Sequence, residues 1–136
     1  ALLAASARLG APIGHDFCVI NLSDNLKSWD ILKSRVIAAA KADFVIAFYN
    51  PRSKSRKNQL SEIYDVLRKN CKSDRIVIYA NSVSTESEAI FETTLSEADA
   101  SSVSMKTLVI IGSSSTKKIR NTGYIYTPRY SGVEKN

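Results

Sequence analysis

The chain has 136 residues, of which 44% are hydrophobic and 24% are charged, a composition typical of one globular domain that excludes a disordered or fibrous protein. No apolar run approaches the roughly 20 residues of a membrane span, so we expect a soluble, cytoplasmic protein without a membrane partner. The net charge is +6, but the basic clusters at 52–57 and 117–120 have no interleaved aromatic residues, which disfavours nucleic acid as a partner. One histidine and the two cysteines, Cys18 and Cys71, lack metal-ligand spacing, so no metal is expected.

The first third of the chain predicts a helix, a strand and a second helix. Residues 1–9 favour a buried apolar helix that stops at Gly10. Because this helix has neither a cap nor a preceding methionine, we expect an upstream part of the protein to be missing. Residues 17–22 are typical of a short buried strand. Ser28 is placed to cap the next helix, in which apolar residues recur at helical spacing from Trp29 to Ala40.

Residues 43–53 are the most distinctive stretch of the sequence. Six of the seven residues from Phe44 to Asn50 are apolar or aromatic without polar alternation, which indicates a central strand covered on both faces. Pro51 then ends the strand. A second amphipathic helix follows, and its apolar positions are Leu60, Ile63, Tyr64 and Leu67.

The remaining strands are expected at 75–80, 89–95, 107–112 and 123–128, the last as an edge strand. The sequence therefore predicts an α/β fold, a mixed sheet with helices on both faces. The buried strands at 44–49, 75–80 and 107–111 each end in small or polar residues, so we expect one ligand-binding rim there. Tyr49, Asn50 and Arg52 are its first candidates.

Two further groups of residues allow more than one interpretation. His15 followed by Asp16 suits an oriented acid or base, while a capping or hydrogen-bonding role is the alternative. Arg52 suits a substrate carboxylate, or is simply solvated.

Residues 112–116 lack both the lysine-serine ending of a P-loop and the spaced glycines of a dinucleotide fingerprint, so we exclude both motifs.

Several segments together resemble one branch of a known family. The segment Gly14-His15-Asp16-Phe17 and the segment Tyr49-Asn50-Pro51-Arg52-Ser53 resemble the precorrin-3B C17-methyltransferase branch of the tetrapyrrole methylases, which acts in cobalamin biosynthesis. The likeness runs in order along nearly the whole chain, through residues 1–12, 14–24, 42–53, 107–112 and 127–129.

The resemblance implies a C-terminal domain of a two-domain enzyme, with residues 1–12 as the helix and link from its missing N-terminal domain. It implies S-adenosylmethionine as cofactor, a precorrin-type tetrapyrrole as substrate, methylation at C17 with ring contraction, and a homodimer. A fragment of this kind should hold half of the cofactor site and be inactive without its other half. The cofactor contacts implied by position are Ala1, Leu2, Tyr49, Asn50, Ala80, Asn81, Ile111 and Gly112.

The resemblance also suggests roles for the remaining candidates. His15 and Asp16 are candidates for the proton movement of ring contraction, and Arg52 for a substrate carboxylate. Residues 81–86 depart from the family because they lack its arginine-containing, glycine-bearing segment. The alternative function is a non-catalytic basic module whose segment 52–57 holds an acidic partner or nucleic acid.

Overall fold

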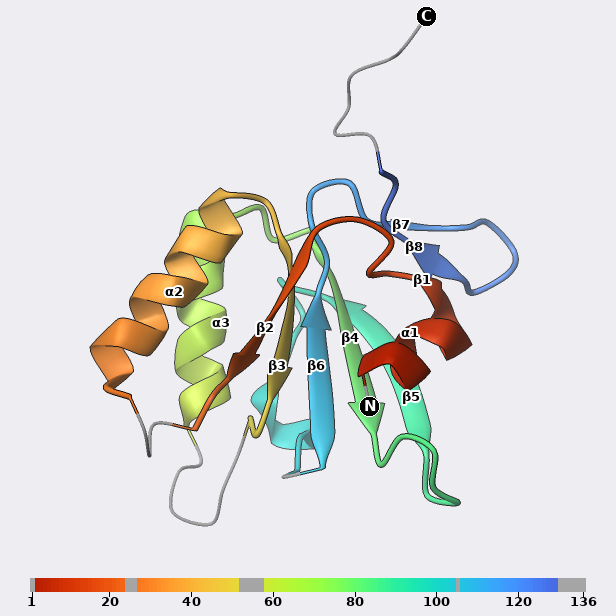
Figure 1. Cartoon of the computed structure of the whole chain (residues 1–136), viewed down its shortest axis with the longest axis horizontal. Helices are drawn as coiled ribbons and strands as arrows, with labels where there is room; N and C mark the ends of the chain where they lie inside the picture. Colours follow the sequence, from red (N-terminus) through yellow and green to blue (C-terminus); the bar gives the residue numbers. More distant parts are fainter. Residues whose placement is uncertain (1, 24–26, 52–57, 105, 130–136) are drawn as a thin grey trace, which may run out of the picture.

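The structure is a computed structural model that describes residues 2–23, 27–51, 58–104 and 106–129 (Figure 1). The described residues form two sheets, with the strand orders β2-β3-β6-β4-β5 and β1-β8-β7. The large sheet consists of β2 (Phe17–Asn21), β3 (Val45–Tyr49), β4 (Ile76–Asn81), β5 (Ala89–Thr94) and β6 (Thr107–Ile111). The small sheet consists of β1 (Gly10–Ala11), β7 (Lys117–Lys118) and β8 (Ile125–Tyr126).

Helices cover both faces of the large sheet, as the sequence predicts. Helices α2 (Trp29–Lys41) and α3 (Gln59–Asn70) pack on one face, and α1 (Leu2–Leu9) lies on the other (Figure 1). The predicted cap of α2 is confirmed, since the backbone N–H of Ile31 donates to Ser28 Oγ at 3.3 Å. A short 3-10 helix, η1 (Ala100–Ser102), precedes β6. Among the described residues, no helix has the length and apolarity needed to cross a membrane.

The strands bury alternate side chains in two separate cores because successive residues of a strand point to opposite faces. On β3, Ile46 and Phe48 pack into the core against α2 and α3. Val45 and Ala47 instead join the core under α1 and β8, together with Ile125. The prediction of a strand covered on both faces is confirmed for β3 from Val45 to Phe48.

Strand direction decides which residues share an edge of the sheet. β3 is parallel to β2, but β6 lies between β3 and β4 and is antiparallel to both. The carboxyl ends of β2, β3 and β4 therefore meet the beginning of β6, and its end lies at the opposite edge. The prediction of one rim at 49–50, 80–81 and 111–112 is thus wrong for 111–112.

Three local predictions also need correction. β2 is an edge strand in which Phe17 and Val19 are 40% and 48% exposed, so it is not buried as expected. β8 covers only two residues and is the centre of the small sheet, where an edge strand at 123–128 was predicted. Helix α1 buries only one side, because Leu3 remains 74% exposed.

Candidate functional site

A cluster of polar side chains lies where β2, β3 and β4 end, and we call this the carboxyl edge. Its members are Asn21, Tyr49, Asn50, Asn81 and Thr107. Asn50 Nδ2 donates to Asn21 Oδ1 at 3.0 Å, so the ends of two parallel strands are joined by their amides. Asn50 has a left-handed backbone, with φ at 53°, a conformation that asparagine tolerates better than most residues. Tyr49, the residue before it, is 41% exposed.

The other half of the carboxyl edge is organised around Thr107. Thr107 Oγ1 donates to Asn81 Oδ1 and accepts the backbone N–H of Ser104 at 2.8 Å. Thr107 is buried at 2% exposure while Asn81 is half-buried, so the buried hydroxyl of Thr107 fixes the Asn81 amide. The carboxyl edge therefore offers three hydrogen-bonded amides and one aromatic ring, which suits a neutral or zwitterionic polar ligand with a flat group.

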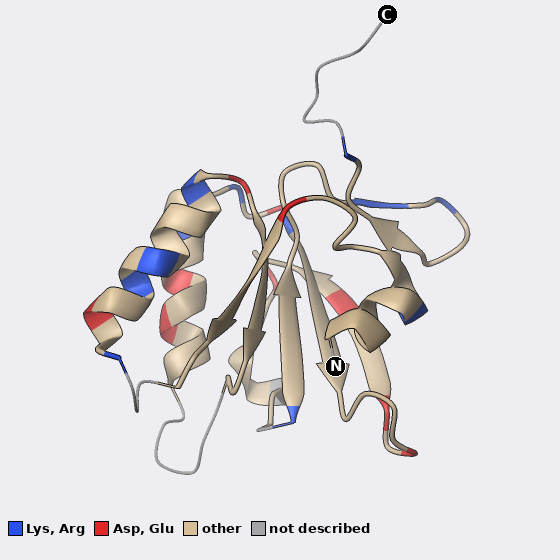
Figure 2. Cartoon of the chain, viewed as in Figure 1, with Lys and Arg blue, Asp and Glu red and all other residues tan. Residues whose placement is uncertain are grey.

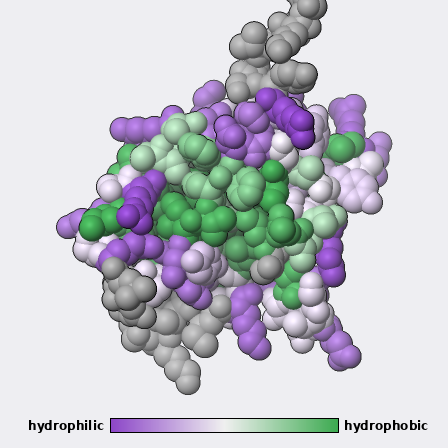
Figure 3. Space-filling view, in the orientation of Figure 1, coloured by the Kyte–Doolittle hydropathy of each residue, from purple (hydrophilic) through white to green (hydrophobic). Residues whose placement is uncertain are grey.

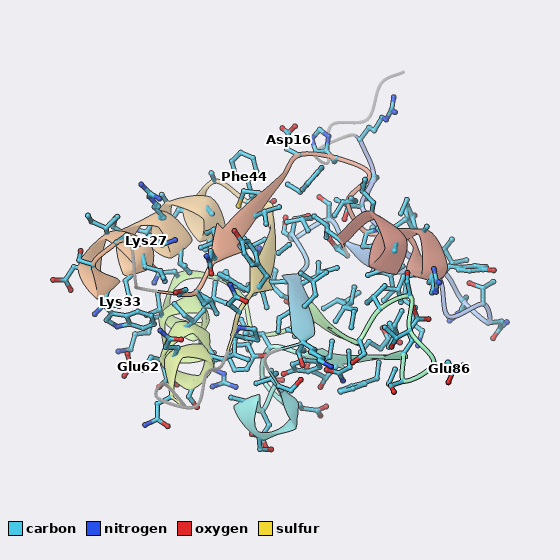
Figure 4. The ribbon with its side chains drawn as sticks, turned by 60° about the horizontal axis from the view of Figure 1, so that its bottom comes forward. Asp16, Lys27, Lys33, Phe44, Glu62 and Glu86 are labelled. Atoms are coloured by element: carbon cyan, nitrogen blue, oxygen red, sulfur yellow. The ribbon has the colours of Figure 1, made fainter. Side chains whose placement is uncertain are left out.

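A second candidate lies at the opposite edge of the sheet, which we call the amino edge. A cavity of about 280 Å³ is lined by His15, Asp16, Ala42, Asp43, Phe44, Ser113 and Ser115. Figure 4 shows Asp16 and Phe44 near each other, well away from Lys27 beside α2. No hydrogen bond joins His15 to Asp16 in the part of the chain that the structure describes. His15 and Asp16 thus line the same cavity but are not hydrogen-bonded to each other.

An ion pair between the buried Arg75 and the exposed Asp43 lies at the amino edge. Arg75 Nη2 lies 3.0 Å from Asp43 Oδ1, and Arg75 Nη1 donates to the carbonyl of Gly112 at 3.2 Å. The Asp43 carboxylate also accepts the backbone N–H of Ser114 at 2.8 Å and its hydroxyl at 2.5 Å. Asp43 therefore ties the loop after β6 to the beginning of β3, which is a structural role.

The structure brings together only some of the residues predicted from the sequence. Tyr49, Asn50 and Asn81 share the carboxyl edge, but the Ala80 side chain is fully buried in the core. Ile111 is 1% exposed and Gly112 is buried, both at the amino edge. Leu2 is half-buried against the core under α1. Ala1 and Arg52 lie outside the described residues, as does the basic segment 52–57.

His15 and Asp16 are separated from the carboxyl edge by the whole of β2. His15 and Asn21 are six positions apart in the sequence, which in an extended chain corresponds to roughly 20 Å. A group at one edge therefore does not reach a ligand at the other edge along the same strand.

Sequence reasoning missed Asn21, Thr107, Asp43 and Arg75. The polar Asn21 ends an apolar run in the same way as Asn50, and this signal was available. Thr107 belongs to the site only because β6 runs antiparallel, which its own apolar pattern does not encode. The described residues contain no group of three or more His, Cys, Asp or Glu side chains that could hold a metal ion.

This mixed sheet with its polar carboxyl edge is that of a tetrapyrrole methylase. Residues 1–99 match the family described as Tetrapyrrole (Corrin/Porphyrin) Methylases, and the chain belongs to this family.

Individual relatives place the chain near one branch of the family. It is 47% identical to a precorrin-3B C(17)-methyltransferase from Sinorhizobium sp, over 99% of this chain and 55% of the relative. It is 41% identical to a probable cobalt-factor III C(17)-methyltransferase of Salmonella typhimurium, over 95% of this chain and 53% of the relative. The crystal structure of the methyltransferase CobJ superimposes with a TM-score of 0.90 at 45% identity, covering 94% of this chain and 53% of that one. The chain thus spans about half the length of these relatives.

Proposed function

We propose that this chain is the C-terminal domain of an S-adenosylmethionine-dependent methyltransferase that methylates C17 of precorrin-3B, or of its cobalt form, with ring contraction. The observation that carries the proposal is 47% identity over 99% of the chain to a relative named for this reaction. Residues 1–12 would then be the helix and link from an N-terminal domain. As the resemblance implies, the full protein would act as a homodimer in the cytoplasm.

The carboxyl edge fits one half of the proposed cofactor site. The amides of Asn21 and Asn50 and the half-exposed Tyr49 ring suit the polar and aromatic parts of a nucleoside-linked amino acid. When bound, S-adenosylmethionine supplies an electrophilic methyl group. The chain's own residues would bind and orient the cofactor. A direct displacement requires chiefly that the reactants are aligned and that water is excluded.

Three of the proposed cofactor residues, Ala80, Ile111 and Gly112, have no exposed side chain at the carboxyl edge. Ala80 has no exposed side chain, so a contribution there rests on its neighbour Asn81. Ile111 and Gly112 lie across the sheet, and the beginning of β6 at Thr107 takes their place at this edge. A role for Ala1 at the cofactor and for Arg52 at a substrate carboxylate remains proposed.

The proposal is tested by incubating the protein as its gene encodes it with S-adenosylmethionine and either precorrin-3B or its cobalt form. We expect the tetrapyrrole to gain one methyl group in a ring-contracted product, with one of the two substrates preferred. His15→Ala should stop ring contraction, because we propose that His15 with Asp16 moves the proton. Methyl transfer to neither substrate would refute the proposed function, and unimpaired contraction in the variant would remove His15 from the mechanism.

A further inference from the structure

The side chain of Asn21, at the end of β2, has an orientation that a backbone group determines. The backbone N–H of Ser23 donates to Asn21 Oδ1 at 3.0 Å. A backbone N–H can only donate, so the atom of Asn21 that faces Ser23 is the carbonyl oxygen of its amide. The Asn21 amide is therefore held in one of its two possible orientations.

The orientation of Asn21 in turn determines that of Asn50. The same Asn21 oxygen accepts a second hydrogen bond from Asn50 Nδ2 at 3.0 Å, and a carbonyl oxygen has lone pairs for both. If the Asn50 amide were reversed, two amide oxygens would face each other without a hydrogen between them. Asn50 therefore turns its nitrogen toward β2. Its Oδ1, to which no described residue donates, points away from β2.

Asn21 is fixed by its surroundings, whereas Asn50 depends on Asn21. Lys27 Nζ donates to the Asn21 carbonyl at 2.8 Å, and Leu22 N donates to Tyr49 O at 3.0 Å. Asn50 follows the last residue of β3 and is exposed. Figure 2 shows no charged residue among the described ones at the ends of β2 and β3, so amide dipoles decide the polarity there. Figure 3 shows hydrophilic residues toward these strand ends, below the apolar area of the same face.

We propose that Asn21 is a positioning residue that presents Asn50 Oδ1 to the ligand of the carboxyl edge, and that the ligand offers a hydrogen-bond donor there. The proposal rests on the proposed function and deepens it. A methyl-donor cofactor has amino and hydroxyl groups, which donate, and a carboxylate and ring nitrogens, which accept. A fixed acceptor selects a donor group and disfavours a carboxylate or a ring nitrogen at this point. Because the amide is ordered before binding, less entropy is lost when the ligand arrives.

Calorimetric titration of the encoded protein with S-adenosylhomocysteine tests the role of Asn21. Asn21→Ala should weaken binding by about twofold to fivefold, because an Asn50 amide that is free to turn spends part of its time with Nδ2 toward the ligand. Asn21→Asp keeps an oxygen for both Ser23 and Asn50, and should restore most of the affinity. Unchanged affinity in Asn21→Ala, or an equal loss in Asn21→Asp, would overturn the positioning role.

A double-mutant cycle separates positioning from a general structural role. In the Asn50→Ala background, Asn21→Ala should have no further effect on affinity, since no amide remains to be oriented. A residue that merely supports the strand end would weaken binding in both backgrounds, and this result would contradict the proposal.

A second double variant, Asn21→Ala with Asn50→Asp, tests the polarity of the contact. An aspartate presents an oxygen in either orientation, so it no longer needs Asn21, and it tolerates the left-handed backbone at this position. This variant should bind S-adenosylhomocysteine at least as tightly as Asn21→Ala alone. Much weaker binding would show that the ligand offers an acceptor to Asn50, and would refute the proposed polarity.

Nuclear magnetic resonance of the ligand-free protein makes the failure of this proposal distinguishable from that of the proposed function. The side-chain amide signals of Asn50, identified by their loss in Asn50→Asp, should show one hydrogen-bonded hydrogen in the wild type and in Asn21→Asp, but none in Asn21→Ala. Identical Asn50 signals in the wild type and Asn21→Ala would overturn the positioning role. A wild type with the fixed amide that binds no S-adenosylhomocysteine would instead refute the proposed function, and with it the ligand contact at Asn50.

Discussion

The hydrogen-bonded tyrosine pair in the core predicts a pH dependence of stability. The hydroxyl oxygens of Tyr64 and Tyr79 lie 2.5 Å apart, and Tyr79 donates to the carbonyl of Asp99 at 3.1 Å. The Tyr64 hydroxyl is therefore the donor between the two rings. Burial raises the pKa of Tyr64, and the hydrogen bond with Tyr79 raises it further. Burial also raises the pKa of Tyr79.

We predict that the free energy of unfolding falls as the pH rises above about 10, the ordinary tyrosine pKa in an unfolded chain. The unfolded state then loses protons that the folded state keeps, so stability present below that pH is lost above it. Tyr64→Phe should flatten this alkaline decline in urea-unfolding experiments. Tyr124→Phe is the matched control, because Tyr124 is 51% exposed. Equal slopes for wild type and Tyr64→Phe would contradict the assignment.

The ion pair at the amino edge predicts a stability loss without a loss of cofactor binding. Asp43→Asn removes the charge that faces the Arg75 guanidinium, whose side chain is only 8% exposed. We expect the variant to be less stable by about 1–3 kcal/mol, because a buried cation loses its counterion while asparagine keeps an acceptor and tolerates the positive φ of 64°. Thermal unfolding measures the effect, and Asp74→Asn, at an exposed neighbour of Arg75, is the control.

Individual elements were predictable where one local signal sufficed. The apolar runs identified β3, β4 and β6, and Ser28 marked the beginning of α2. Direction and order were not predictable, because an apolar run such as 107–111 looks the same whether it runs parallel or antiparallel to its neighbours. That ambiguity displaced Ile111 and Gly112 from the carboxyl edge. It also hid the edge position of β2, whose Phe17 and Val19 look like core residues in the sequence.

Two neighbouring residues of β3 are expected to differ in role: Phe48 in stability and Tyr49 in binding. Phe48 is fully buried against α2 and α3, whereas Tyr49 ends the strand at 41% exposure. Phe48→Ala should cost about 3–5 kcal/mol of unfolding free energy, because it leaves a cavity in the core. Tyr49→Ala should cost less than about 1 kcal/mol, within the range of surface substitutions. Urea unfolding of the two variants side by side measures the difference, and similar losses would mean that Tyr49 is a core residue and not a binding one.

At the scale of the whole molecule, the two edges of one sheet carry different tasks. The carboxyl edge presents exposed polar groups supported from below by Thr107, and the amino edge ties β3 to the loop after β6 through Asp43. The chain belongs to the tetrapyrrole methylases and spans about half the length of its relatives. We propose that the carboxyl edge is one wall of a methyl-donor site.

Calorimetric titration of the encoded protein with S-adenosylhomocysteine tests this claim most directly. We predict saturable binding with one ligand per chain, weakened about fivefold by Asn50→Ala, since losing one well-formed hydrogen bond costs on the order of 1 kcal/mol. Asn70→Ala, at the end of α3, should bind as the wild type does. Absence of binding to the wild-type protein, or full affinity in Asn50→Ala, would contradict the assignment of the carboxyl edge.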